Sequence, residues 1–404
     1  MFKSRILPLI GALTMAVFST ATLAEDDNAA AQSTAVQVEP AKPTSLPPPP
    51  SLSSQSYVLI DYRSGRVLVS YNPDRQIEPA SLTKMMTSYI VSSELAAGSI
   101  SWDDKVKVSR KAYKIGGSSM FLEEGTFVSV ENLKRGMVIQ SGNDATIALA
   151  EHLVGSEDRF VQIMNDYAKR LGLSGTQYKN STGMPADGHY STSIDLAKLG
   201  AALIRDFPDD YSMYAEKEFE WAGISQPNRN NLLLRDATVD GIKTGHTNAA
   251  GYCLVASAER NGTRLISVVT GAASAKARED DSLKLLRYGF DNFATKQILA
   301  GGTEIEKIRV LMGEKSEVSA GLASPLFVSV PNIAQTSVNT QLILAGDIVA
   351  PVRRGQAVAT VVAIQDGKEV ARKPVVALED IEEGAWWQKL RDQAVIKIEG
   401  VLPW

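Results

Sequence analysis

The segment Ser81-Leu82-Thr83-Lys84 places a hydroxyl and an amine three residues apart. On a helix, this spacing brings the two side chains onto one face and within contact range. A serine is a weak nucleophile until a base removes its proton, and a lysine can be that base if burial or a neighbouring positive charge keeps it neutral. Because a Ser-x-x-Lys occurs about once by chance in such a chain, the segment alone is a weak signal of nucleophilic catalysis.

Two further segments carry groups that could serve the same chemistry. Ser141-Gly142-Asn143 falls between two predicted helices, where its hydroxyl could relay a proton and its amide could hold a substrate carbonyl. Lys243-Thr244-Gly245 enters a predicted strand, where Lys and Thr could bind a carboxylate and Gly lets a substrate backbone approach the strand edge. Taken singly, each fits a turn or an exposed strand start equally well. Their order is that of penicillin-binding proteins and class A β-lactamases.

The stretches PASLTKMMT, QSGNDA, VDGIKTGHT and AAGY resemble the low-molecular-mass penicillin-binding proteins that are D-alanyl-D-alanine carboxypeptidases. The similarity covers about residue 55 to the C-terminus. It implies a serine peptidase without a metal or other cofactor. Its substrate would be a peptidoglycan stem peptide ending in D-Ala-D-Ala, cleaved through an acyl-enzyme on Ser81, and β-lactam antibiotics would acylate the same serine as inhibitors.

The resemblance also implies a role for each site residue. Lys84 would be the general base, Ser141 would help pass a proton to the leaving amine, and Lys243 would keep Lys84 neutral by its charge. The oxyanion would lie between the backbone N–H groups of Ser81 and His246. The residues implied in catalysis are Ser81, Lys84 and Ser141, and those implied in substrate binding are Asn143, Lys243, Thr244, Gly245, His246, Arg229 and Arg278.

Three other functions remain open on the sequence. A class A β-lactamase needs a Glu that activates the deacylating water, and between Gln177 and Tyr190 the only acid is Asp187. A D,D-endopeptidase uses the same catalytic residues, but the predicted second domain favours the carboxypeptidase. A non-catalytic cell-wall scaffold would have no reason to keep Lys84 beside Ser81.

The order of elements predicts an α/β (α+β) catalytic domain over residues 57–300, of the β-lactamase/transpeptidase-like kind that the resemblance implies. Strand patterns at both ends of this region enclose a block of helical patterns, so an antiparallel sheet with inserted helices is expected. The predicted strands are 57–62, 66–71, 251–260 and 263–271, and the predicted helices are 81–96, 131–139, 143–154, 158–171, 193–204 and 279–293. Asn261-Gly262 and, further on, Asp366-Gly367 are hairpin-turn signals.

Residues 301–382 read as a small all-β domain, and 383–404 as a terminal amphipathic helix. On that helix one face collects Trp387, Leu390, Ala394, Ile398 and Val401. The hypothesis is a helix that attaches the protein to a membrane surface without crossing it. The alternative is a helix that packs on its own domain, and the resemblance favours the anchor.

The N-terminal residues predict export. Residues 1–24 have a basic start, an apolar stretch at 6–18 and small residues before a cleavage point, which is the layout of a signal peptide. A membrane anchor is the alternative, but thirteen apolar residues are too few to span a bilayer. Residues 25–56 read as a proline-rich linker. The predicted location is therefore the periplasmic face of the bacterial cytoplasmic membrane.

Composition excludes several classes of protein. The chain has 404 residues and a net charge of −4, which argues against a nucleic-acid partner. One cysteine permits no internal disulfide, and three histidines leave no Cys/His zinc cluster. Cys253 is predicted to be a buried, inert thiol, His189 a turn or packing residue and His152 an ordinary residue on a helix face.

Overall fold

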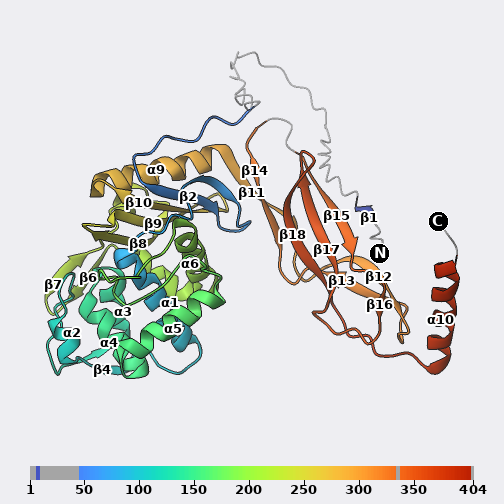
Figure 1. Ribbon diagram of the computed structural model, residues 1–404, viewed down its shortest axis with the longest axis horizontal. Helices are drawn as coiled ribbons and strands as arrows, with labels where there is room; N and C mark the ends of the chain where they lie inside the picture. Colours follow the sequence, from blue (N-terminus) through green and yellow to red (C-terminus); the bar gives the residue numbers. More distant parts are fainter. Residues whose placement is uncertain (1–5, 10–44, 334–336, 402–404) are drawn as a thin grey trace, which may run out of the picture. The chain divides into compact units, whose positions relative to one another are not determined.

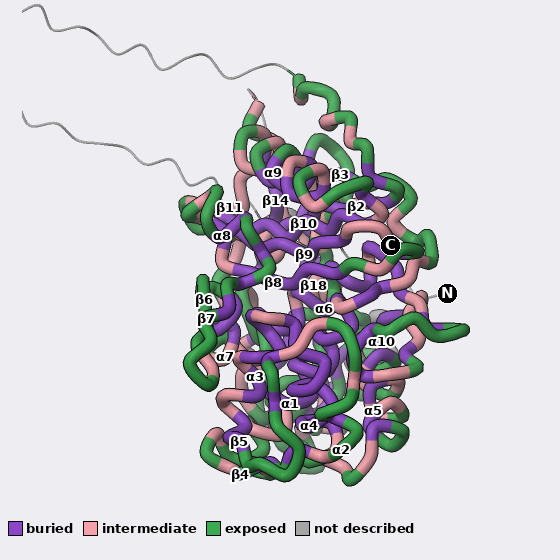
Figure 2. The backbone as a smooth tube through the Cα atoms, turned by 90° about the vertical axis from the view of Figure 1, so that its left-hand side faces the viewer, coloured by how far each residue is buried: buried purple, intermediate pink, exposed green. Residues whose placement is uncertain are grey.

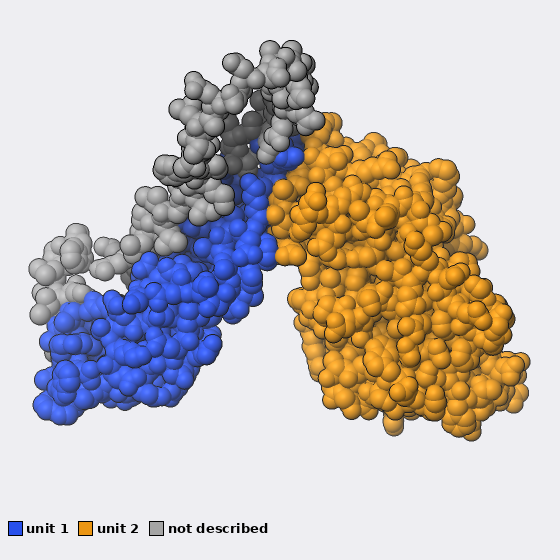
Figure 3. All heavy atoms as spheres, turned by 180° about the vertical axis from the view of Figure 1, so that it is seen from behind, with its two compact units in different colours: residues 1–46, 296–404 blue, residues 47–295 orange. Residues whose placement is uncertain are grey.

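The computed structural model describes residues 6–9, 45–333 and 337–401 (Figure 1). The chain divides into two compact units (Figure 3). Residues 47–295 form one, and the other contains the described residues from Lys296 onward together with β1 (Ile6–Leu9).

The first unit contains a five-stranded antiparallel sheet in the order β3-β2-β10-β9-β8. Its strands are β2 (Ser56–Asp61), β3 (Val67–Tyr71), β8 (Val239–Thr247), β9 (Gly251–Arg260) and β10 (Thr263–Ala272). The strands therefore come from both ends of this unit, with the helices inserted between them, which confirms the predicted fold class. Asn261 and Gly262, both at positive φ, form the turn between β9 and β10, as a type I′ hairpin requires.

Helices cover both faces of this sheet. The helix α9 (Ala275–Asn292) packs on one face, and α6 (Ser193–Asp206) and α1 (Lys84–Ala96) belong to the layer on the other (Figure 1). Figure 2 shows the central strands buried throughout most of their length. Successive side chains of β2 point to opposite faces, so Val58 joins the helical core and Leu59 joins the core under α9.

The remaining elements of this unit surround that core. They are η1 (Ala80–Thr83), α2 (Arg110–Lys114), α3 (Val130–Val138), α4 (Asn143–Val154), α5 (Glu157–Arg170), α7 (Pro208–Tyr211), η2 (Ser212–Ala215) and α8 (Leu232–Arg235), with the two-stranded pairs β4 (Lys105–Lys107) and β5 (Phe127–Ser129), and β6 (Glu218–Trp221) and β7 (Ile224–Pro227).

Hydroxyl side chains decide where several helices begin. Ser156 accepts a hydrogen bond from Arg159 N before α5, Thr192 accepts one from Asp195 N before α6, and Ser274 accepts one from Ala277 N before α9. The cap at Ser274 explains why α9 starts four residues before the predicted helix. The predicted helix 81–96 is also divided, because its first turn is the 3₁₀ turn η1.

The second unit is an all-β domain followed by a helix. Its larger sheet has seven strands in the order β1-β15-β17-β18-β13-β12-β16. β11 (Phe293–Leu299) leads into this unit, and its first three residues still belong to the other one. The remaining strands, besides β1, are β12 (Glu304–Leu311), β13 (Glu317–Gly321), β14 (Leu326–Pro331), β15 (Val338–Leu344), β16 (Ile348–Val349), β17 (Ala357–Gln365) and β18 (Lys368–Ala377). Asp366 and Gly367, both at positive φ, form the predicted hairpin turn.

The helix α10 (Trp386–Val401) follows the acidic segment 379–383. Its start is bound to the β-domain: Asp392 Oδ2 accepts a hydrogen bond from Met312 N at 2.6 Å, and Gln388 donates one to the carbonyl of Glu314 at 3.3 Å. On the outer side Trp386, Trp387 and Leu390 are 77%, 54% and 62% exposed. Among the described helices, none is long and apolar enough to cross a bilayer.

The N-terminal predictions fall mostly outside the described residues. Of the predicted signal peptide only residues 6–9 are described, as β1 paired with β15. Of the predicted linker, residues 25–44 are outside. Its last ten residues, 47–56, belong to the first unit, where Ser53 and Ser54 bind the Asp281 carboxylate.

Candidate active site

Ser81 and Lys84 lie next to each other where η1 passes into α1. The Lys84 Nζ is 3.1 Å from Ser81 Oγ, 2.7 Å from Asn143 Oδ1 and 2.6 Å from the carbonyl oxygen of Thr182. The Lys84 side chain is 1% exposed. The amine therefore has three oxygen partners and is shielded from solvent, and one of the partners is the hydroxyl that the sequence pairs with it.

Burial lowers the pKa of Lys84 to about 7, against the opposing effect of the Asp144 carboxylate. An amine with this pKa is neutral in a substantial fraction of molecules near neutral pH, so it can accept a proton. The sequence-based expectation was that the charge of Lys243 keeps Lys84 neutral. Burial is the cause that lowers the pKa of Lys84 in the structure. The pKa of Lys243 is itself well below its usual range, because of burial first and the charge of Lys84 second.

Ser141 holds its hydroxyl in an unusual position. Its backbone φ is +68°, which lies in the left-handed region that residues other than glycine rarely adopt. Its Oγ is buried and has no hydrogen-bond partner among the described residues. A buried hydroxyl without a partner is unfavourable unless another molecule satisfies it, and Ser141 lines the same cavity as Ser81.

Asn143 is engaged by the protein rather than left free. Its Oδ1 accepts from Lys84, and its Nδ2 donates to the carbonyl of Gly116 at 2.7 Å. The prediction that this amide also holds a substrate carbonyl stays a prediction. Here Asn143 fixes the amine of Lys84 and ties α4 to the loop at 116–122.

The strand β8 brings Lys243, Thr244, Gly245 and His246 to the site. That Gly245 admits a substrate backbone stays a prediction, and the structure gives a further reason for a glycine. A Cβ at this position would lie 3.0 Å from the carbonyl oxygen of Pro79 and 3.3 Å from Ala80 Cβ. The missing side chain therefore lets β8 pack directly against η1, the turn that carries Ser81.

A cavity of about 330 Å³ joins these segments. Its lining residues are Ser81, Ser118, Ser141, Arg229, Thr244, Gly245, His246, Tyr252, Ala275 and Arg278. Seven of the ten predicted site residues lie on this cavity. The side chains of Lys84, Asn143 and Lys243 are buried, at 1%, 5% and 2% exposure.

Two arginines add positive charge to the cavity. Arg229 donates from Nε to Gln140 Oε1 at 3.2 Å. Arg278 is 7% exposed, its guanidinium lies 5.7 Å from the Tyr252 ring centroid, and its Nε has no hydrogen-bond partner among the described groups. Two guanidinium groups on one small cavity suit an anionic ligand such as a carboxylate.

Sequence reasoning missed Ser118, Tyr252, Ala275 and the carbonyl of Thr182. Tyr252 stands in the AAGY stretch that carries the resemblance, and its ring lies 4.1 Å from that of His246. Nothing in the sequence could point to the Thr182 carbonyl, because every residue has a backbone carbonyl whatever its type. The Asp144 carboxylate binds Met120 N at 3.0 Å and Leu122 N at 3.1 Å, and so holds the loop next to Ser118.

The carboxylate of Glu157 supports the segment that presents the Thr182 carbonyl. Its Oε1 accepts from the N–H and hydroxyl of Ser181 at 2.9 and 2.7 Å, and Lys111 Nζ lies 2.8 Å from its Oε2. The ion pair and hydrogen bonds lower the pKa of Glu157, although burial opposes them.

We expect Glu157→Ala to lower the free energy of unfolding by about 2 kcal/mol, because the buried N–H and hydroxyl of Ser181 lose their acceptor. Acylation by penicillin should also slow, since the carbonyl that binds Lys84 shifts with Ser181. Denaturant unfolding and stopped-flow acylation measure the two effects. Asp166→Ala, at an exposed position of the same helix, is the matched control, and equal behaviour of the two variants would contradict the prediction.

The other singled-out residues have the structural roles predicted for them. His189 is buried against Thr83, at 2.9 Å from Oγ1, and burial lowers its pKa to about 4. Cys253 is fully buried and its pKa is raised by burial to about 11, so the thiol is inert. His152 is exposed on α4. Among the described residues, no cluster of His, Cys, Asp and Glu could hold a metal ion.

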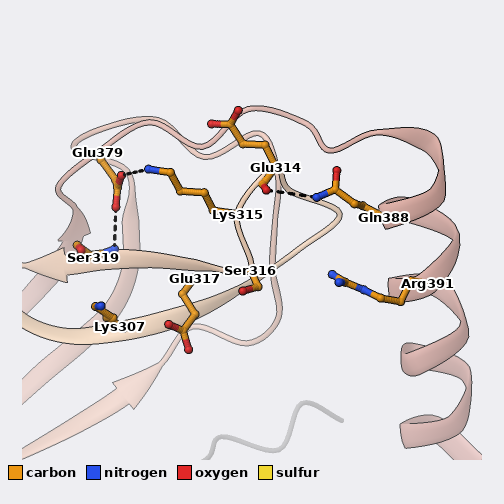
Figure 4. A pocket seen from close by; sticks show the side chains of 9 residues that line it. All are labelled: Lys307, Glu314, Lys315, Ser316, Glu317, Ser319, Glu379, Gln388 and Arg391. Atoms are coloured by element: carbon orange, nitrogen blue, oxygen red, sulfur yellow. Dashed lines mark hydrogen bonds and ion pairs between the residues drawn. The ribbon is translucent and has the colours of Figure 1, made fainter.

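The second unit has a cavity of about 470 Å³ near the start of α10 (Figure 4). Its lining is charged, and Lys315 bridges to Glu379 at 2.6 Å across it. The Ser319 hydroxyl on this cavity donates to the Glu304 carboxylate at 2.6 Å, but the cavity contains none of the three sequence motifs, so it is not the candidate catalytic site.

Comparison with known proteins matches both units. Residues 42–274 match the family model of D-alanyl-D-alanine carboxypeptidase, and residues 293–383 match that of the penicillin-binding protein 5 C-terminal domain. The chain is 43% identical over 359 residues to the D-alanyl-D-alanine carboxypeptidase DacA of Haemophilus influenzae, covering 87% of this chain and 91% of the relative. DacA of Escherichia coli (strain K12) is 43% identical over 357 residues, 86% of this chain and 89% of the relative.

Solved structures agree with these matches. Penicillin binding protein 5 from Haemophilus influenzae superposes with a TM-score of 0.77 at 44% identity, covering 83% of this chain and 99% of that chain. Penicillin-binding protein D2 from Listeria monocytogenes, in its ampicillin-bound form, has a TM-score of 0.56 at 32% identity, covering 60% of this chain and 100% of that chain. The resemblance seen in the sequence is confirmed, and the chain belongs to the D-alanyl-D-alanine carboxypeptidase family of serine peptidases.

Proposed function

We propose that this carboxypeptidase removes the terminal D-Ala from peptidoglycan stem peptides through an acyl-enzyme on Ser81. The observation that carries the proposal is the 3.1 Å contact between Ser81 Oγ and the buried, low-pKa amine of Lys84. Such a pair supplies a nucleophile and its general base within hydrogen-bond reach. The names of the relatives, D-alanyl-D-alanine carboxypeptidases, support the choice of substrate.

In the acylation step, neutral Lys84 takes the proton of Ser81 Oγ as that oxygen attacks the penultimate D-Ala carbonyl carbon. The resulting oxyanion lies between the backbone N–H groups of Ser81 and His246, an arrangement that typically contributes about 3 kcal/mol to the barrier reduction. When the C–N bond breaks, Lys84 and Ser141 pass a proton to the departing D-Ala amine. Ser141 suits this relay because its buried hydroxyl otherwise lacks a partner.

The terminal carboxylate of the substrate binds to Thr244, Arg229 and Arg278, and the buried Lys243 lies next to Thr244 on β8. Arg278 is suited to this contact because it lines the cavity and its buried Nε has no hydrogen-bond partner among the described groups. Asn143 acts by holding Lys84 in line with Ser81. Water then hydrolyses the ester to release the shortened stem peptide and restore Ser81.

The direct test is to incubate the purified protein with a D-Ala-D-Ala pentapeptide and, separately, with penicillin, and to follow both by intact mass. Released D-Ala and a persistent penicilloyl adduct support the proposal. Rapid penicillin turnover would favour a β-lactamase, and the absence of both products would favour a scaffold. Cleavage of cross-linked muropeptides in place of the pentapeptide would favour an endopeptidase. Ampicillin bound to the Listeria monocytogenes relative supports the expected adduct.

The pKa of Lys84 predicts the pH dependence of acylation. Below about pH 7 the amine is protonated and cannot accept the Ser81 proton, so kcat/KM for the pentapeptide should fall as the pH is lowered through about 7. It should reach a plateau above that pH. A profile measured from about pH 5 to about pH 9 checks this, and a profile without a change near 7 would contradict the assignment of Lys84 as the base.

We further propose export to the periplasm and attachment to the cytoplasmic membrane surface through α10. Trp386, Trp387 and Leu390 project from this helix into solvent, and tryptophan favours the lipid–water boundary. The binding of the helix start to the β-domain through Asp392 leaves these three side chains on the outer side.

Replacing Trp386, Trp387 and Leu390 together with alanine should reduce binding to phosphatidylethanolamine/phosphatidylglycerol vesicles by at least about ten-fold, because the apolar area that enters the interface is lost. Flotation measures this, with hydrolysis of the soluble pentapeptide unchanged. Val349→Ala, at a half-exposed site on β16, serves as the control. Undiminished flotation of the triple variant would refute the attachment through α10.

A further inference from the structure

A second cavity of the catalytic unit, here called the β2–β3 cavity, measures about 490 Å³. It is lined by Ser51, Leu52, Ser53, Ser54, Gln55, Tyr57, Tyr71, Asn72 and Arg75. Within this lining, Leu52 is the sole aliphatic side chain, and the remainder carry hydroxyl, amide, guanidinium or phenol groups. Its volume lies in the range of small-molecule binding sites.

Two tyrosines form one wall of this cavity. Tyr57 and Tyr71 are cross-strand partners on β2 and β3, and their rings stack with centroids 5.4 Å apart at an angle of 25°. Tyr71 is 51% exposed. Because Tyr57 supports it from behind, the Tyr71 ring is a pre-positioned flat surface with one side open to solvent.

Polar groups line the same cavity as this ring. Asn72 is held by a hydrogen bond from its Nδ2 to Gln55 O at 3.3 Å, while its own carbonyl accepts from Ser56 Oγ at 2.9 Å. The exposed Arg75 guanidinium has no ion-pair partner among the described residues. A half-exposed aromatic face with hydroxyl, amide and guanidinium groups beside it suits a pyranose ring, which presents C–H groups on its faces and hydroxyls at its rim.

The β2–β3 cavity lies at the same end of the sheet as the active site. One end of the sheet contains the end of β8 at Thr247, the start of β2 at Ser56 and the end of β3 at Tyr71. With strands about 4.8 Å apart, the four spacings between β3 and β8 amount to about 19 Å. An extended five-residue peptide spans about 17 Å.

The helix α9 connects the two cavities. Arg278 lines the active-site cavity. One turn further, Asp281 accepts hydrogen bonds from Ser53 and Ser54, which line the β2–β3 cavity, at 3.1 and 2.8 Å. The two cavities are therefore held at a fixed separation by one rigid element.

We propose that the β2–β3 cavity binds a sugar of the glycan strand whose stem peptide occupies the active site. This inference rests on the proposed function, since it takes peptidoglycan as the substrate. The extended stem peptide, at about 17 Å, and the lactyl ether that joins it to the glycan together cover the strand separation of about 19 Å, so one substrate can reach both. Binding at the cavity would favour stem peptides attached to glycan over free peptides, and would not alter the reaction at Ser81.

The experiment compares two soluble substrates on the full chain: a free D-Ala-D-Ala pentapeptide and the same pentapeptide attached to N-acetylglucosaminyl-N-acetylmuramic acid. The wild-type protein should show a KM for the disaccharide peptide lower by about five-fold, the effect of one aromatic stacking contact. Tyr71→Ala should remove that preference while kcat and KM for the free pentapeptide stay unchanged. Tyr71→Trp should retain it, because the ring is kept.

Phe127→Ala, an exposed aromatic on β5 that lines neither cavity, is the matched control and should retain the preference. The proposal is overturned if the wild-type protein treats the two substrates alike, or if Tyr71→Ala lowers activity on both equally. Failure of the proposed function would look different, since the wild-type protein would then cleave neither substrate.

Discussion

A Ser81→Ala variant is expected to lose pentapeptide hydrolysis by about 10⁴-fold or more and to form no penicilloyl adduct. Removing the hydroxyl leaves Lys84 without a nucleophile to activate, and no other described hydroxyl lies within hydrogen-bond distance of Lys84 Nζ. Intact mass after incubation with penicillin measures adduct formation, and a D-Ala release assay measures turnover.

The fold should remain intact in this variant, because Ser81 is only partly buried and Lys84 keeps Asn143 Oδ1 and the Thr182 carbonyl as partners. Ser118→Ala, at another hydroxyl on the same cavity, is the matched control and should still form the adduct. A full-rate adduct on Ser81→Ala would show that another residue is the nucleophile.

A Lys84→Met variant is expected to slow acylation by about 10²- to 10⁴-fold, the range that general-base catalysis contributes. Methionine has a similar length and no charge, so the side chain still fills the buried site. The remaining slow reaction should lose the change in rate near pH 7 that the wild-type protein shows. Single-turnover acylation by penicillin across the pH range measures both effects.

Lys134→Met separates this effect from the general cost of losing a buried lysine. Lys134 is also 0% exposed, with its Nζ 2.6 Å from both Asp210 Oδ2 and Ser92 Oγ. Its loss leaves Asp210 unpaired and should lower the melting temperature. The pH profile of acylation should stay as in the wild-type protein. If the two variants change that profile alike, Lys84 is a structural residue and not the base.

The distance along the chain between two contacting residues explains which contacts the sequence could predict. Ser81 and Lys84 are three residues apart, so one helical turn brings them together whatever the rest of the chain does. The hairpin turns at Asn261-Gly262 and Asp366-Gly367 are also local, because these residue types tolerate positive φ. The sheet built from both ends of the catalytic unit followed from the order of strand and helix patterns.

Contacts across long stretches of chain were beyond such reasoning. Lys84 meets Asn143 across 59 residues and the Thr182 carbonyl across 98. No side-chain type marks a backbone carbonyl, so the second partner had no signal. The burial that lowers the Lys84 pKa is likewise a property of the packed molecule, and for that reason the sequence pointed to the charge of Lys243 instead.

The sequence by itself determined the catalytic residue types, their order, the family, and the two-part architecture with its terminal helix. Only the tertiary structure decided that Asn143 binds the amine of Lys84 and that the absence of a side chain at Gly245 lets η1 pack against β8. It also decided that residues 47–56 belong to the catalytic unit, where several of them line the β2–β3 cavity. The physical reason is the same in each case. Residue type and spacing specify local geometry, whereas burial and close backbone approach depend on which distant segments pack together.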